Sequence, residues 1–231
     1  MAKYAVIGLG KFGMTVATTL YKNGSEVIAI DNDIKLVEEA SAKVSNAYKL
    51  DCTDELALKQ LQMQDMDAVI LAIGQNIEVS ILTTAILKKI GVAYIVAKAD
   101  NKLHSKILEI IGVQQAVIPE EQIGLQIAHT LLSRNVVKYL DLNTGHSIVE
   151  YLAPKKYIGK TLMELALPTE KGVNVVAIKS NKMTVTEEGD NKIECIVNDL
   201  PGANDIITEG DTLILLGPTS RINNIISEEG E

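Results

Sequence analysis

Short apolar runs alternate with amphipathic segments through the first half of the chain, and this spacing predicts strands alternating with helices. Uninterrupted apolar runs of this length are typical of strands that are buried on both faces of a parallel sheet. Six segments have this character: residues 4–7, 27–30, 47–50, 68–73, 94–98 and 116–118. Helical patterns lie between them at 35–43, 55–62, 77–90 and 104–111. We therefore expect an α/β fold with a doubly wound parallel sheet of six strands.

The pattern changes after about residue 140. Before the change, residues 121–135 predict a helix with Ile123, Ile127 and Leu131 on one stripe, which covers either the chain's own sheet or a second copy. Beyond it, apolar runs at 147–152, 173–178, 183–185 and 212–216 are bounded by turn residues, and short helical patterns occur at 161–166 and 220–227. Residues 187–205 are polar apart from 193–197, so we expect a loop there. The chain is predicted to have two domains, 1–138 and 139–231, the second a small α+β domain.

A glycine-rich turn follows the first apolar run. Gly8, Gly10 and Gly13 form a Gly-x-Gly-x-x-Gly pattern that opens a helical segment, and the second apolar run ends at Asp31. In a dinucleotide-binding βαβ unit, the first glycine permits a tight turn, the second lets the backbone approach a phosphate, and the third lets the helix pack closely on the strand. The start of the helix then faces the phosphates, and Asp31 can accept both ribose hydroxyls. The pattern predicts a nucleotide site in a Rossmann-like sheet, and because Asp31 would repel a 2′-phosphate, it argues against NADP.

Polar residues follow the carboxyl ends of the predicted strands, which is the edge where open α/β sheets bind ligands. These polar ends are residues 31–33, 51–53, 74–76, 98–100 and 119–121. Taken singly, residues such as Thr53 and Asn76 fit helix caps equally well. Together with the glycine turn, the set predicts the rim of a pocket.

Composition narrows the function further. Of the 231 residues, 47% are hydrophobic but only 3% are aromatic, so we expect an aliphatic core. The formal net charge is −8, with acids and bases mixed and no basic stripe, so we expect no nucleic-acid partner. No apolar run approaches the roughly 18–20 residues that span a bilayer, and the first strand leaves no room for a signal peptide. Cys52 and Cys195 match no metal spacing, so we expect a cytoplasmic protein with reduced thiols.

An oxidoreductase is the main alternative. Tyr151 and Lys155 match the Tyr-x-x-x-Lys pair of short-chain dehydrogenases, but Pro154 disfavours the helical turn that this pair requires, and that family's glycine spacing is absent. Tyr94 and Lys98 also match, on a predicted strand that would hold them about 13 Å apart. With no Ser-His-Asp grouping, metal cluster or P-loop elsewhere, we expect no catalysis and a nucleotide that acts as a signal. An NAD(H)-dependent redox sensor or small oxidoreductase stays open as the alternative.

These residues resemble the regulators of K⁺ conductance, the RCK or TrkA-type family, over nearly the whole chain, and most of all the cytoplasmic ring subunits of Ktr-type potassium uptake systems. The segments that carry the resemblance are 5–10, 72–76, 82–84, 119–120, 158–162, 175–179 and 210–213. The resemblance implies a regulatory, gating subunit at the inner face of the cell membrane, where ATP or ADP switches a ring that controls a membrane K⁺ pore subunit. It also implies a homodimer formed through the Rossmann halves and assembled into an octameric ring. NAD(H) stays open as a ligand beside ATP and ADP.

The resemblance also implies which residues bind the nucleotide. By position in the family pattern, Asp31 would hold the ribose, with Asn32 and Asp33 beside it, and Asp51 and Cys52 would border the adenine. The phosphates and the far wall would be formed by Gly8, Gly10, Lys11, Phe12, Gly13, Ile73, Gly74, Gln75, Lys98, Ala99, Asp100 and His104. Lys11 stands where family members often carry arginine that reaches a γ-phosphate. Lysine keeps the charge but loses the bidentate fork, and a solvated loop lysine is the alternative interpretation.

Glu120 completes the predicted site. It matches a carboxylate that, in Ktr-like rings, lies near the nucleotide at the dimer interface and binds a divalent cation, Mg²⁺ or Ca²⁺. Two symmetry-related carboxylates repel each other unless a cation or protons neutralise them. The alternative is an acid placed at a helix N-terminus by the dipole. In some relatives the C-terminal domains bind cyclic di-AMP, and that ligand stays open for residues 139–231.

Overall fold

The structure is a computed structural model that describes residues 1–142, 144–185 and 191–227. The chain divides into two compact units, Met1–Glu120 and Glu121–Glu231. Helix α6 (Pro119–Leu132) begins at the end of the first unit and continues into the second. The domain boundary expected from the sequence, after residue 138, lies beyond this helix and stays a prediction.

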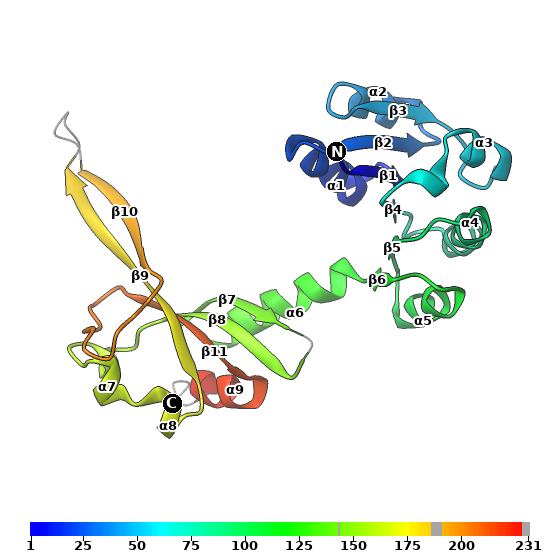
Figure 1. Cartoon of the computed structure of the whole chain (residues 1–231). Helices are drawn as coiled ribbons and strands as arrows, with labels where there is room; N and C mark the ends of the chain where they lie inside the picture. The colour runs from blue at the N-terminus through cyan, green and yellow to red at the C-terminus, as the bar shows by residue number, and fades with distance from the viewer. Residues whose placement is uncertain (143, 186–190, 228–231) are drawn as a thin grey trace. The chain divides into compact units, whose positions relative to one another are not determined.

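The first unit is built on a six-stranded sheet with the order β3-β2-β1-β4-β5-β6 (Figure 1). All neighbouring strands are parallel. The order changes direction between β1 and β4, so the carboxyl ends of these two strands flank the switch point where such sheets bind ligands. The predicted Rossmann-like sheet is confirmed, with strands β1 (Lys3–Ile7), β2 (Glu26–Asp31), β3 (Asn46–Lys49), β4 (Ala68–Leu71), β5 (Ile95–Lys98) and β6 (Gln115–Val117).

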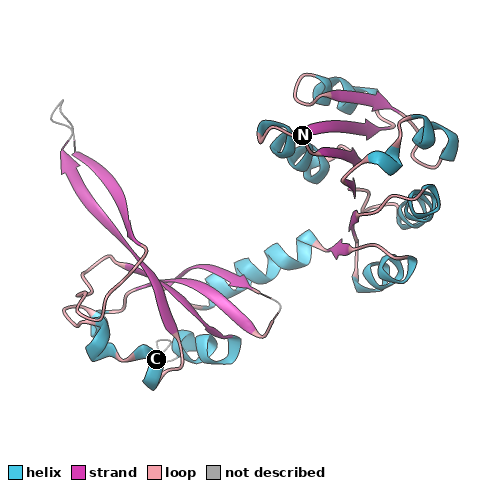
Figure 2. Ribbon diagram, viewed as in Figure 1, coloured by secondary structure: helices cyan, strands magenta, loops and turns pink. Residues whose placement is uncertain are grey.

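Helices cover both faces of this sheet (Figure 2). Side chains alternate along β1, so that Ile7 packs in one aliphatic cluster with Leu87 and Leu108, and Val6 packs in the other with Ala17. Each fully buried aliphatic side chain contributes roughly 1.5–3 kcal/mol of hydrophobic stabilisation. One face therefore carries α1 (Lys11–Lys22) and α2 (Ile34–Ser41), and the other carries α3 (Glu55–Gln60), the 3₁₀ turn η1 (Met63–Asp65), α4 (Ile77–Ile90) and α5 (Lys102–Ile111).

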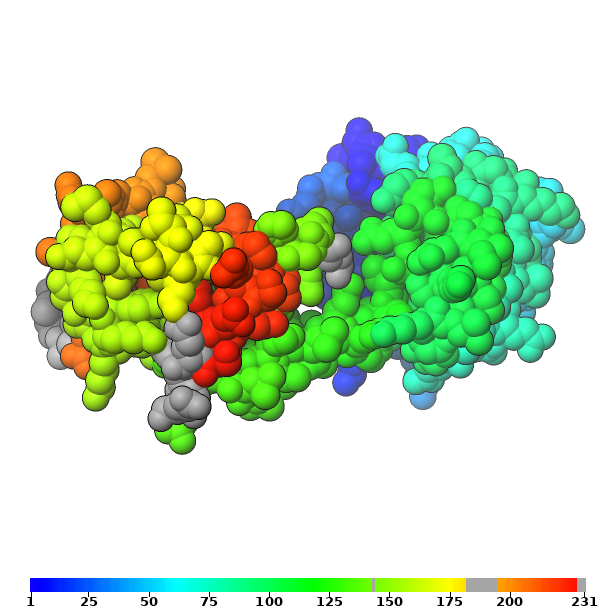
Figure 3. Space-filling model, turned by 90° about the horizontal axis from the view of Figure 1, so that it is seen from below, coloured from blue at the N-terminus to red at the C-terminus, as the bar shows by residue number. Residues whose placement is uncertain are grey.

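Helices α4 and α5 pack side by side and form an outer surface of the first unit (Figure 3). On α5, Leu103 is 70% exposed and Ile110 is 77% exposed. These residues are seven positions apart, so they lie on the same face of the helix. This unit therefore presents an apolar stripe to its surroundings.

The second unit has a five-stranded sheet with the order β10-β9-β11-β8-β7. Neighbouring strands are antiparallel, and the core includes Tyr151, Ile207 and Leu213. The predicted small α+β unit is confirmed, with strands β7 (Val136–Asp141), β8 (His146–Leu152), β9 (Asn174–Val185), β10 (Asn191–Asn198) and β11 (Thr212–Pro218) and helical elements η2 (Lys155–Tyr157), α7 (Leu162–Leu165), α8 (Leu167–Glu170) and α9 (Thr219–Ser227).

Two strands of this sheet were missed by sequence analysis. In β7, the register on β8 shifts between Val136 and Lys138, so the buried residues Val136 and Tyr139 stand three apart and do not show the alternation of a regular strand. The loop prediction for 187–205 is wrong for Asn191–Asn198, which pair with β9 as β10. Residues 186–190 lie outside the described residues. Pairing with a long neighbouring strand stabilises β10, and a local apolar pattern does not reveal such pairing.

Candidate functional site

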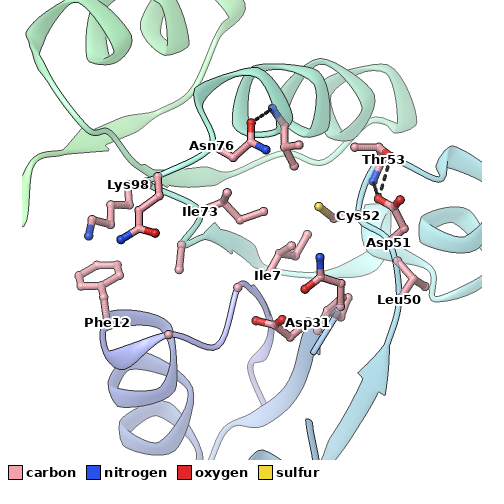
Figure 4. Close-up of a pocket in the computed structure, with 18 of the residues that line it drawn as sticks. Ile7, Phe12, Asp31, Leu50, Asp51, Cys52, Thr53, Ile73, Asn76 and Lys98 are labelled. Atoms are coloured by element: carbon pink, nitrogen blue, oxygen red, sulfur yellow. Dashed lines mark hydrogen bonds between the residues drawn. The ribbon is translucent and has the colours of Figure 1, made fainter. Parts of the chain in front are cut away.

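A cavity of about 780 Å³ opens at the carboxyl ends of the parallel strands, next to the switch point between β1 and β4 (Figure 4). Its floor includes Ile7 at the end of β1 and Ile30 at the end of β2, both almost fully buried. Its rim carries the side chains of Asp31, Asp51 and Lys98. A cavity with an aliphatic floor and a few charged rim groups suits a small organic ligand with polar substituents.

The glycine turn forms one wall. Gly8 has a φ of +94°, which only glycine adopts readily, and its N–H donates to the Ile30 carbonyl at 2.8 Å. At Gly13, an added Cβ would lie 1.8 Å from the Gly8 carbonyl oxygen, so α1 packs directly against the turn. At Gly10, an added Cβ would meet nothing within 4 Å. The turn therefore leaves open space beside Gly10, on the wall of the cavity.

Helix α1 begins at this wall. Its N-cap is Gly10, which has no side chain to cap the helix, and the first turn carries no acidic residue. The first N–H groups of a helix lack intrahelical partners and carry partial positive charge. The start of α1 is therefore suited to bind an anion such as a phosphate.

Asp31 is held by the backbone at the end of β2. Its Oδ2 accepts a hydrogen bond from the Leu9 N–H at 2.6 Å, and its Oδ1 accepts one from the Asp33 N–H at 2.9 Å. A carboxylate oxygen can accept more than one hydrogen bond, so both oxygens keep capacity for hydroxyl donors. The carboxylate is thus oriented before any ligand arrives.

Residues 50–53, which follow β3, line the end of the cavity opposite the glycine turn. Asp51 accepts hydrogen bonds from the N–H of Thr53 at 2.9 Å and from its hydroxyl at 2.7 Å, and these bonds hold the pKa of Asp51 below its usual value. Cys52 is buried, and its sulfur accepts a hydrogen bond from the Thr83 hydroxyl at 3.3 Å. Burial raises the pKa of the Cys52 thiol, so it stays protonated near neutral pH.

Lys98, at the end of β5, meets three groups. Its stem crosses Gly74, where an added Cβ would lie 3.0 Å from Cε. Its Nζ lies 5.9 Å from the centroid of the Phe12 ring and forms an ion pair with Glu120 at 2.5 Å. The hydrogen bond from Lys98 holds the pKa of Glu120 below its usual value. The cavity therefore contains an ammonium near the start of α1, already paired with a carboxylate of the same chain.

Most of the residues predicted for the site line this cavity. They are Gly8, Gly10, Lys11, Phe12, Asp31, Asn32, Asp51, Cys52, Ile73, Gly74, Gln75, Lys98 and Glu120. Whether each of them contacts a ligand stays a prediction. Thr53 and Asn76, which belong to the polar strand ends predicted as the pocket rim, also line it. Residues that the sequence analysis did not assign contribute as well, namely Ile7, Ile30, Leu50, Ala72 and Val79. The last apolar residue of each strand, directly before the polar rim, is the sequence signal that could have identified several of them.

The other predicted residues do not line the cavity; these are Gly13, Asp33, Ala99, Asp100 and His104. Asp33 caps α2 by accepting from the Lys35 N–H, and Ala99 is fully buried. His104 is buried too, and its Nδ1 accepts from the Asp100 N–H at 3.1 Å. The hydrogen bonds and burial of Asp33, Ala99, Asp100 and His104 give these residues structural roles. That any of the five residues contacts a ligand stays a prediction.

The cavity fits a nucleotide better than it fits a divalent ion. The open space at Gly10 and the uncapped start of α1 suit phosphates, and Asp31 suits ribose hydroxyls. In the part of the chain that the structure describes, no three His, Cys, Asp or Glu side chains come together as metal ligands. Glu120, the predicted cation ligand, is paired with Lys98 of the same chain.

Among the described residues, no helix has both the length and the apolar composition to cross a membrane.

Comparison with known proteins identifies close relatives. Residues 4–119 match the TrkA-N domain. The chain is 42% identical over 221 residues to Ktr system potassium uptake protein C of Bacillus subtilis (strain 168), a match that covers 96% of this chain and 94% of the relative. It is 35% identical over 226 residues to Ktr system potassium uptake protein A of the same organism, covering 98% of this chain and 96% of the relative. Protein A of Vibrio alginolyticus is 33% identical over 222 residues, covering 96% and 95%.

Solved structures share the fold. The GsuK RCK domain aligns with a TM-score of 0.65 and 16% identity over 100% of this chain and 48% of that chain. The GsuK channel bound to NAD aligns with a TM-score of 0.62 and 16% identity over 95% of this chain and 38% of that chain. The chain thus spans about half or less of these solved chains, and at this identity the likeness supports the fold alone.

Proposed function

This chain belongs to the Ktr family of potassium uptake proteins and has a TrkA-N domain in its first unit, and from this premise we propose how it works. It is a regulatory subunit of a potassium uptake system. Its first unit binds an adenosine nucleotide, ATP or ADP, in the cavity at the carboxyl ends of the sheet. The nucleotide is a signal and undergoes no reaction there.

One observation carries the nucleotide proposal. The uncapped start of α1 and the open space beside Gly10 lie on the same cavity as Asp31, whose carboxylate is already oriented by two backbone N–H groups. A helix start suited to anions and a carboxylate suited to hydroxyls therefore share one cavity, which supports binding of the phosphates and the ribose of one nucleotide. Asp51 and Cys52, at the other end, are proposed to border the base.

Regulation then requires unequal binding to two states, since a ligand shifts an equilibrium only by its differential affinity. Lys11 is exposed at the start of α1 and lines the cavity. We propose that it meets the terminal phosphate of ATP, in its own chain or in a neighbouring copy. Lys11 would thereby give ATP and ADP different affinities, although lysine lacks the bidentate geometry of arginine.

The assembly proposed for this family member is a homodimer and, from it, an octameric ring that controls a membrane K⁺ pore subunit. Two apolar surfaces support self-association. None of the residues of α6 is buried, and Ile123, Ile127 and Leu131 are each more than half exposed. The stripe of Leu103 and Ile110 on α5 is a second exposed surface. Large exposed apolar patches are typical of protein interfaces.

Three further features of the proposed function depend on that assembly. A divalent cation at Glu120 is proposed to use the carboxylate of a second copy as well, because among the described residues of one copy Glu120 belongs to no group of three potential metal ligands. Cyclic di-AMP is a proposed ligand of paired second units. The protein is proposed to be cytoplasmic and peripheral at the membrane, held there by its pore partner.

A thermal-shift panel of ATP, ADP, NAD⁺ and NADH tests the nucleotide proposal. A ligand at a hundred times its Kd adds about 2.7 kcal/mol, which raises the midpoint by roughly 5–11 °C for a chain of this size. We expect such a shift with ATP or ADP, and a smaller one in Asp31→Asn. The matched control is Asp67→Asn, since Asp67 also accepts a backbone hydrogen bond, from Lys3, but does not line the cavity.

Two results would contradict the proposal. If none of the four nucleotides raises the midpoint, the cavity does not serve as a nucleotide site. If NADH alone raises it, the alternative of an NAD(H)-dependent redox sensor or small oxidoreductase is favoured; the GsuK channel, which shares the fold, has been solved with NAD bound.

A further inference from the structure

Lys98 is confined within the cavity. The stem of its side chain crosses Gly74, and its ammonium lies over the Phe12 ring at a distance that permits a cation–π contact. Only 18% of its side chain is exposed. Phe12 is the second residue of α1, so the ammonium is held near the positively charged start of that helix.

Glu120 has much more freedom than its partner. Its side chain is 68% exposed, and it lines the cavity where it pairs with the Lys98 ammonium. Ion pairs with a well-exposed partner contribute little to stability, because side-chain entropy and solvation offset the attraction. Glu120 can therefore leave the pair at low cost, whereas Lys98 has little room to follow it.

We propose that the Lys98–Glu120 ion pair is a charge switch: Lys98 exchanges Glu120 for a phosphate of the bound nucleotide and so releases Glu120. This inference rests on the proposed function. Lys98 and the start of α1 contribute positive charge to one part of the cavity, so a phosphate held there competes with Glu120 for the ammonium. Two anions beside one ammonium repel each other, which disfavours simultaneous contact of Glu120 and a phosphate with Lys98.

The released residue lies where the change can be transmitted. Glu120 is in the first turn of α6, the helix that has no buried residue and that is proposed to meet a second copy. A carboxylate freed from Lys98 is attracted by the positive end of its own helix. Occupation of the phosphate site is thus coupled to the charge at the start of α6, and the nucleotide gains unequal affinity for the two states.

Titration calorimetry on the full chain, in EDTA so that no divalent cation contributes, tests the switch. In Glu120→Gln the competitor for Lys98 is removed, so we expect ATP to bind about three- to tenfold more tightly and adenosine, which has no phosphate, to bind as before. The matched control is Glu78→Gln, which removes a carboxylate from the first turn of α4 but none from Lys98. In a Lys98→Gln background, the gain from Glu120→Gln should fall to that of the control.

Hydrogen exchange gives a second readout. We expect ATP to change exchange in the peptide that covers residues 117–126 of the wild type, and Glu120→Gln to show much of that change without ATP. The switch is overturned if Glu120→Gln leaves ATP affinity unchanged or weakens it, or if the gain persists in Lys98→Gln. If the wild type binds ATP and either of these results is obtained, only the switch fails. If the wild type binds no nucleotide, the proposed function fails and the switch fails with it.

Discussion

Replacing Gly13 by alanine tests the close packing of α1 on the glycine turn. The new Cβ would lie 1.8 Å from the carbonyl oxygen of Gly8 and 3.0 Å from the Cβ of Ala72. The first contact is with backbone, so no side-chain rotation relieves it, and the two atoms must move apart by more than about 1 Å. Inserting atoms into a packed site usually costs about 1–3 kcal/mol. Because the whole first turn of α1 must shift, we expect about 3 kcal/mol, which lowers the midpoint by roughly 6–12 °C.

The control is Gly10→Ala, three residues earlier in the same motif. Gly10 has a φ of −60°, which alanine adopts without strain, and its added Cβ meets nothing within 4 Å. Alanine reduces the conformational entropy of the unfolded chain, which stabilises the protein, but it is a poorer N-cap than glycine, which destabilises it. Because these effects oppose each other, the unfolding free energy should stay within about 0.5 kcal/mol of the wild type. Nucleotide affinity should nevertheless fall about tenfold, because the methyl group occupies the space beside the turn.

Urea unfolding followed by far-ultraviolet circular dichroism measures the stabilities of both variants, and calorimetry measures their nucleotide affinities. The reasoning is refuted if Gly13→Ala remains within about 1 kcal/mol of the wild type. It is refuted equally if Gly10→Ala is destabilised as much as Gly13→Ala, since the two glycines would then not have separate roles.

Two more predictions concern buried groups. Burial lowers the pKa of His104, whose Nδ1 accepts from the Asp100 N–H, so the fold favours the neutral ring; its contribution to stability is full above the unfolded pKa of about 6.5 and is lost as the pH falls below it. The unfolding free energy of the wild type should thus drop more steeply between pH 7.5 and 5.5 than that of His104→Gln, and equal slopes would contradict this. Iodoacetamide should label exposed Cys195 before buried Cys52, by about tenfold in rate. Saturating ATP should lower the labelling rate of Cys52 further. A labelling rate that ATP does not change would show that Cys52 does not border the bound nucleotide.

The parallel sheet could be predicted because its signals are local. Each strand is a short apolar run, each helix has an amphipathic pattern, and the Gly8–Gly10–Gly13 spacing marks the turn between the first strand and helix. The antiparallel sheet was predicted less completely. A register shift hides the alternation of β7, and β10 depends on pairing with β9, which no short window of sequence contains.

The site shows the same division. That Asp31, Gly8 and Gly10 line one cavity could be predicted from their order along the chain. The stacking of Lys98 on Gly74 and its pairing with Glu120 could not, because these contacts join segments more than 20 residues apart, and depend on where the strands end. Asp33 and His104 have the residue types of ligand contacts, yet the structure uses the first as a helix cap and buries the second. Capping and binding require the same polar atoms, so sequence alone does not separate them.

Two backbone hydrogen bonds orient Asp31 on the cavity wall. Because Leu9 and Asp33 both donate to this carboxylate, the turn after β1 and the end of β2 form one rigid frame. A ligand that docks there loses little entropy to ordering of the protein, so its arrival at this end should be fast and independent of the groups that its phosphates meet later. In the proposed switch, the slower adjustment is then the departure of Glu120 from Lys98. If the proposed function holds, recognition and response are therefore separate steps: nucleotides that share a ribose bind Asp31 alike, and only their phosphates affect the Lys98–Glu120 pair.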